Sequence, residues 1–100
     1  MQDNFSAKKK PKHFKIYING KRFSIFAISR SVDKNVRYNE EVESLCLKTK
    51  IKGQGFPKDA IIQTDFDEEN IEYRCTWSGT AYQPGREDYF YKVVSKQKIE

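Results

Sequence analysis

The side chains of this chain that are best suited to a function are lysine, arginine and tyrosine at alternating positions. The function that they suit is binding of a polyanion. Lys48, Lys50 and Lys52 alternate along a predicted strand, which places three ammonium groups on one face, about 6.6 Å apart. The three positive charges of such a row repel one another, and a bound phosphate backbone relieves this repulsion. Lysines also protect an edge strand from pairing with another chain, so the row has a structural explanation as well.

Outward-facing aromatic side chains are the second part of this pattern. Tyr17 is predicted beside Arg22 on a hairpin, and Tyr89 and Tyr91 are predicted on the outer face of the last strand. Proteins that bind single-stranded nucleic acid combine cationic grooves with aromatic platforms, and each stacked base contributes about 1–3 kcal/mol. Aromatic residues also favour strands in general, so burial within a small rolled sheet explains them equally well.

Together these residues predict a nucleic-acid interface in which cations contact phosphate and tyrosines stack on bases. RNA or another single strand is favoured over duplex DNA, because no segment forms a confident recognition helix for the major groove. The predicted interface consists of Lys8, Lys9, Lys10, Lys12, Lys15, Tyr17, Arg22, Lys48, Lys50, Lys52, Tyr89 and Tyr91.

The distribution of charge supports this prediction and also an alternative. The 100 residues carry a net charge of +5; residues 1–37 hold ten bases and two acids, a net +8, whereas residues 59–72 hold six acids and no base. Uneven charge favours polyanionic partners. It also fits a non-enzymatic inhibitor or adaptor, of the kind that phages or mobile elements encode against a host nuclease or defence complex. Such a protein would bind a partner with an acidic or nucleic-acid-binding surface. A third hypothesis is an assembly subunit that pairs through its sheet edges.

Catalysis and metal or cofactor binding have little support in the sequence. The chain has one histidine, His13, and its two cysteines, Cys46 and Cys75, lie outside any metal-ligand spacing. The acidic run over 65–70 lacks the glycine and the glutamate that a calcium loop needs. We therefore expect no enzyme, metal site or cofactor. No apolar run reaches membrane length and no secretory signal is present, so we expect a cytoplasmic protein with reduced thiols.

The best-defined element is a β-hairpin around Asn19-Gly20, the preferred pair for a type I′ turn. A two-residue turn sets Tyr17 opposite Arg22. Because strand side chains alternate, one face becomes apolar and the other basic and aromatic. The predicted core face carries Phe14, Ile16, Ile18, Phe23 and Ile25; the opposite face carries His13, Lys15, Tyr17, Arg22, Ser24 and Phe26.

The remaining elements are less sharply defined. Residues 1–12 are predicted to be a flexible basic tail, and residues 13–100 a single β-rich domain. Residues 29–39 look like a polar connection, and residues 38–46 fit either a short helix or a strand. Further strands are predicted over 45–52, 60–66, 71–77 and 87–96.

A turn at Pro84-Gly85 is predicted to set Trp77 opposite Lys92, with Cys75, Trp77, Phe90 and Val94 in the core. The expected fold is mainly β, a small antiparallel β-roll or barrel of five to six short strands. At most one short helix would accompany it, which would make the domain α+β.

Overall fold

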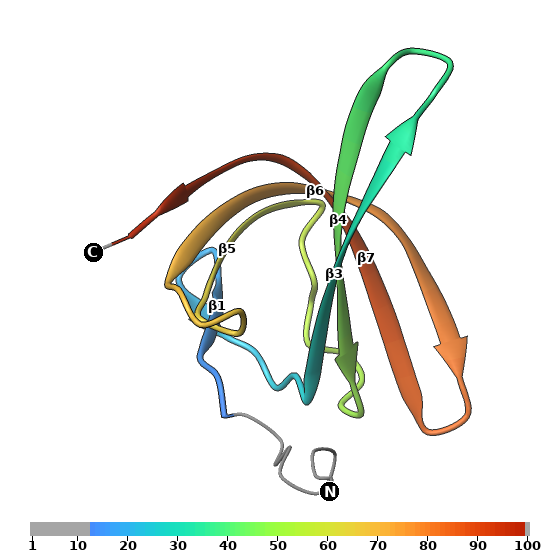
Figure 1. Cartoon of the computed structure of the whole chain (residues 1–100). Helices are drawn as coiled ribbons and strands as arrows, with labels where there is room; N and C mark the ends of the chain where they lie inside the picture. The colour runs from blue at the N-terminus through green and yellow to red at the C-terminus, as the bar shows by residue number, and fades with distance from the viewer. Residues whose placement is uncertain (1–12, 100) are drawn as a thin grey trace, which may run out of the picture.

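Seven strands form a single antiparallel sheet in the computed structural model, which describes residues 13–99 (Figure 1). They are β1 (Ile16–Ile18), β2 (Lys21–Arg22), β3 (Ala27–Asn35), β4 (Glu40–Thr49), β5 (Asp59–Thr64), β6 (Ile71–Gln83) and β7 (Arg86–Lys98). Their order is β2-β1-β5-β6-β7-β4-β3, so β2 and β3 are the edges and the sheet stays open. The prediction of a mainly β domain is confirmed, but a roll or barrel of five to six strands is wrong.

Residues 13–99 contain no helix, so the short helix allowed for 38–46 does not form. That region of the chain therefore has no helix with the length and apolar character needed to cross a membrane.

The Asn19-Gly20 turn forms as its chemistry predicts. Both residues have positive φ, 52° at Asn19 and 80° at Gly20, as a type I′ turn requires. Tyr17 lies opposite Arg22, which confirms the predicted register. Because β2 ends at Arg22, the two sides of the hairpin separate beyond that pair.

Residues 29–39, predicted as a connection, are mostly strand. β3 pairs with β4 without interruption, from Ala27 opposite Lys48 to Asn35 opposite Glu40. The outer part of this hairpin projects from the rest of the sheet (Figure 1); we call residues 31–44 the arm and the remainder the body. Most residues of the arm are at least partly exposed, so it lacks the apolar alternation by which strands are recognised in a sequence.

The predicted two-residue turn at 84–85 closes β6 and β7 into a long hairpin. Its register holds as far as Gly79, but beyond a β-bulge Trp77 lies opposite Tyr91 rather than Lys92. One inserted residue changes which β7 side chains share a face with Trp77. Phe90 and Val94, predicted to share the core with Trp77, are 37% and 70% exposed, and Trp77 itself is 41% exposed.

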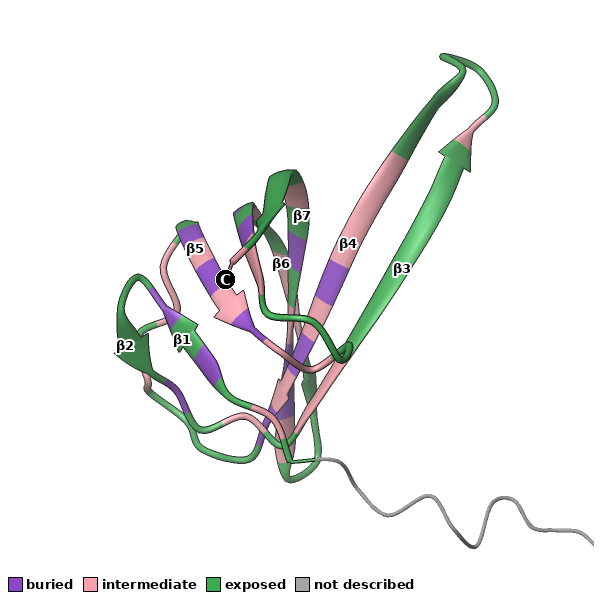
Figure 2. Ribbon diagram, turned by 60° about the vertical axis from the view of Figure 1, so that its left-hand side comes forward, coloured by how far each residue is buried: buried purple, intermediate pink, exposed green. Residues whose placement is uncertain are grey.

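The core lies on the inner face of the curved sheet, with the buried positions spread over most strands of the body (Figure 2). Its buried side chains are Ile16, Ile18, Phe23, Leu45, Leu47, Ala60, Ile62, Tyr73, Cys75 and Tyr91. Phe14 and Ile25 pack against them, so the predicted core face of the first hairpin is confirmed.

A loop supplies cover for one part of this face. Residues 50–58 connect β4 to β5, and the Phe56 ring stacks on Tyr89 with 3.9 Å between centroids and contacts Phe23 at 4.8 Å. The Tyr91 hydroxyl donates a hydrogen bond of 2.6 Å to the Pro57 carbonyl oxygen. A sheet needs a second layer to bury its apolar face, and here the loop contributes to that layer.

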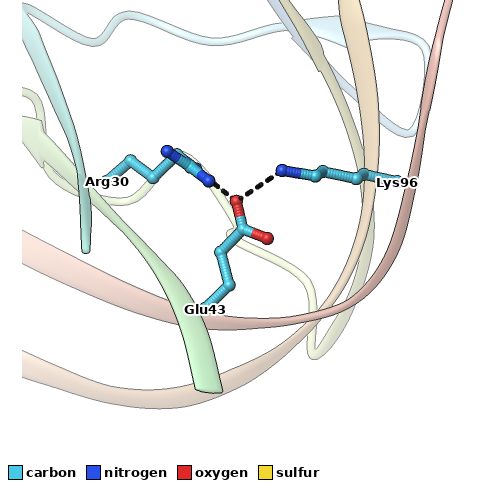
Figure 3. Close-up of polar contacts among 3 residues, drawn as sticks. All are labelled: Arg30, Glu43 and Lys96. Atoms are coloured by element: carbon cyan, nitrogen blue, oxygen red, sulfur yellow. Dashed lines mark hydrogen bonds and ion pairs between the residues drawn. The ribbon is translucent and has the colours of Figure 1, made fainter. Parts of the chain in front are cut away.

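At the base of the arm, the inner face becomes ionic. The Glu43 carboxylate on β4 accepts hydrogen bonds from Arg30 of β3 and from Lys96 of β7, the latter at 3.1 Å (Figure 3). Burial alone would raise the pKa of Glu43, but these two hydrogen bonds and the positive charges of Lys96 and Arg30 together outweigh it and hold the pKa below its ordinary value. The ionic cluster thus joins three strands where apolar packing ends.

Candidate nucleic-acid interface

Three of the predicted interface residues lie around one cavity. Lys15, Tyr17 and Arg22 line a hollow of about 640 Å³ together with Ser24 and Gln54. The cavity exists because the hairpin ladder ends at Arg22, so the segments on its two sides diverge. Its lining also includes four apolar residues, Phe14, Ile16, Phe23 and Ile25. We call this feature the hairpin cavity.

The charged and aromatic groups of the hairpin cavity are accessible. Tyr17 is 39% exposed and lies beside Arg22 across the two strands. Within residues 13–99, neither the Lys15 ammonium nor the Arg22 guanidinium forms an ion pair. One acid is near: the Asp65 carboxylate accepts a 2.8 Å hydrogen bond from the Lys15 backbone N–H. The cavity therefore offers two unpaired cations and one aromatic face, with a carboxylate at one side.

Gln54 holds one wall of the cavity in place. Its side-chain oxygen accepts a 2.7 Å hydrogen bond from the Ser24 N–H, and its amide nitrogen donates to the Ser24 carbonyl at 3.1 Å. The same nitrogen lies 2.9 Å from the Thr49 hydroxyl. A glutamine within a glycine-rich turn gives no signal of this role in the sequence, and it was not predicted.

The row of three strand lysines does not form. β4 ends at Thr49, so only Lys48 lies in the strand, half-buried between its neighbours Ala27 and Asp88. Lys50 instead places its ammonium 5.1 Å from the centre of the Phe26 ring. Lys52 is exposed in the loop, and none of the three lines the hairpin cavity. The edge-strand explanation of the row is also wrong, because β4 lies between β3 and β7.

Tyr89 and Tyr91 were predicted to face outward, and this is wrong. The bulge in β6 places both on the inner face, where Tyr91 is fully buried and Tyr89 stacks on Phe56. Burial raises the pKa of Tyr91, and burial together with its hydrogen bond to Glu87 raises the pKa of Tyr89 to about 12. Neither ring is a free platform for a base.

Lys8, Lys9, Lys10 and Lys12 lie outside the described residues. The outward placement of Phe26 is confirmed, since its side chain is 47% exposed.

The thiols are poorly placed for nucleophilic chemistry. Cys75 is buried in the core, and burial raises its pKa to about 12; burial also raises the pKa of the half-buried Cys46. A thiol must lose its proton to act as a nucleophile, so both sites disfavour that reaction. Among the described residues, no group of three His, Cys, Asp or Glu side chains is arranged to hold a metal ion.

In sequence, the chain matches no protein-family model and no curated protein.

Proposed function

We propose that the protein binds single-stranded nucleic acid, with RNA favoured, at the hairpin cavity. The observation that carries this proposal is the meeting of Lys15, Tyr17 and Arg22 around one hollow of about 640 Å³. This volume is within the range of ligand sites, and the lining combines apolar residues with charged and polar groups. In this role Lys15 and Arg22 contact phosphate, and Tyr17 stacks on a base.

A single strand fits the described surface better than a duplex. Residues 13–99 include no helix that would enter a major groove. An exposed tyrosine between two cations suits a base that is free to leave its neighbours and stack on protein. Compared with the sequence prediction, the proposed contacts are reduced to the three residues around the cavity.

Fluorescence polarisation tests the proposal with labelled single-stranded RNA, single-stranded DNA and duplex DNA at about 50 and 200 mM salt. The double variant Lys15→Ala/Arg22→Ala is expected to make the plot of log affinity against log salt less steep, by the amount that about two phosphate contacts contribute. Tyr17→Ala is expected to lose about 1–3 kcal/mol of binding free energy with the salt slope unchanged.

Lys92→Ala is the matched control, because Lys92 is exposed on β7 and does not line the cavity. If both the double variant and Tyr17→Ala bind like the wild type, the hairpin cavity is not the site. If the wild type binds each probe weakly and without preference, the proposal is overturned. The remaining candidate is then an inhibitor or adaptor that binds a protein, and its partner should stay bound after nuclease treatment.

A further inference from the structure

The free edge of β3 is the longest unpaired strand edge within residues 13–99. β3 has nine residues and pairs with β4 on one side only, whereas the other edge strand, β2, has two. The β3–β4 ladder has no bulge, and no proline interrupts β3. Figure 2 shows β3 on the side of β4 that faces away from the body. Such an edge is a ready template for another strand, because its outer N–H and C=O groups are free to pair.

We propose that this edge binds the same edge of a second copy of the chain, antiparallel, about a two-fold axis through Ser31. An axis perpendicular to the sheet keeps every side chain on its own face, so it must pass through a residue rather than between two. Placed at Ser31, the axis pairs all nine residues of β3. The resulting assembly is one continuous sheet across two copies.

Charge selects this register over its neighbours. With the axis at Ser31, Ser29 lies opposite Asp33 and no like charges oppose one another. Moving the axis to Arg30 sets that arginine against itself, and moving it to Val32 sets Arg30 against Lys34. Like charges directly opposite one another destabilise a strand pair. The Arg30 charge is also compensated within its own chain, where Glu43 accepts its hydrogen bond (Figure 3).

The same register covers apolar side chains that are exposed in the single chain. At the ends of the paired strands it brings Val36, in the turn after Asn35 of one copy, near Phe26, which precedes Ala27 of the other; these residues are 85% and 47% exposed. Val32, which is 45% exposed, lies opposite the aliphatic part of Arg30. The Phe26 backbone is fixed by a 3.0 Å hydrogen bond from its N–H to the Lys48 carbonyl oxygen. A second copy thus covers exposed apolar side chains at both ends of β3.

The test is sedimentation equilibrium of the full chain after nuclease treatment, from about 1 µM to 1 mM. The wild type and the matched control Ser31→Thr are expected to shift from the monomer mass of 11.8 kDa towards twice that value as concentration rises. Ser31→Lys and Ser31→Asp each oppose like charges on the axis and are expected to weaken association at least tenfold. An equimolar mixture of these two variants is expected to recover dimers, because lysine then opposes aspartate.

Any one of three results overturns the proposal: a wild type that stays monomeric, variants that associate like the wild type, or a mixture that stays monomeric. Recovery in the mixture shows that the single variants are folded. Since Ser31 does not line the hairpin cavity, failure here leaves the proposed binding of nucleic acid unaffected.

Discussion

The body and the arm use the same strands for opposite purposes. Along β4, Leu45 and Leu47 are fully buried in the body, whereas Glu43, next on the same face, belongs to the ionic cluster at the base of the arm. Further out, Glu40 and Glu41 of β4 are exposed, and Val36 and Tyr38 in the turn before it are 85% and 67% exposed. One strand therefore contributes to the core at one end and to an exposed surface at the other. This arrangement implies that stability resides in the body and that the arm is free to contact a partner.

The largest effect is expected when a core leucine and a valine of the arm are each replaced by alanine. Leu45→Ala removes a side chain with no exposed surface and leaves a cavity, so we expect a loss of about 2–5 kcal/mol in the free energy of unfolding. Val32→Ala, at a half-exposed position, is expected to change it by about 0.5 kcal/mol or less. Urea denaturation at a concentration where the chain is monomeric measures both. Equal losses would mean that the arm is part of the core.

A smaller effect is expected where the loop over 50–58 meets the body. Tyr91→Phe removes the hydroxyl that donates to the Pro57 carbonyl, and we expect a loss of about 1–3 kcal/mol because the carbonyl loses its partner. Tyr82→Phe is the matched control, since Tyr82 is 75% exposed and should give almost no change. Denaturation and the proteolysis rate of the loop together report the difference. An unchanged Tyr91→Phe variant would show that the loop is held by its other contacts, the packing of Phe56 and the hydrogen bonds of Gln54, without the Tyr91 hydroxyl.

Within the body, the sequence could predict those features that depend on adjacent residues. The Asn19-Gly20 turn depends on two adjacent residues, and its short loop fixes the register, so the neighbours Tyr17 and Arg22 were placed correctly. By contrast, the bulge between Trp77 and Gly79 has no local signal, yet it decides that Tyr91 and Val93, and not Phe90, share a face with Cys75. The one extra residue that this bulge adds to β6 is why Tyr91 was assigned to the wrong face.

The arm was missed for a different reason. Sequence patterns detect strands through an apolar face, and β3 pairs with β4 while exposing most of its side chains. The hairpin cavity was predictable only in its residues: Lys15, Tyr17 and Arg22 were named, but the hollow between them depends on where β2 ends and on Gln54. Such tertiary contacts join segments that are distant in the chain.

The smallest expected effect concerns the ionic cluster that divides the two regions. Because the pKa of Glu43 is lower in the folded chain than in the unfolded chain, its ionisation stabilises the fold at pH values above its unfolded pKa of about 4.3. This contribution is lost as the pH falls through the lower folded value.

We therefore expect Glu43→Gln to cost less than about 1 kcal/mol at pH 7, since Arg30 and Lys96 are partly exposed and screened by water. The difference from the wild type should shrink as the pH falls below about 4.3, and also at high salt. Glu40→Gln, at an exposed position without an ion pair among the described residues, is the control and should show no such trend. Thermal unfolding of the three proteins from pH 7 to pH 3 measures the effect. A difference that stays constant over this range would mean that Glu43 supports the arm through the packing of its side chain, and that its charge does not stabilise the boundary between arm and body.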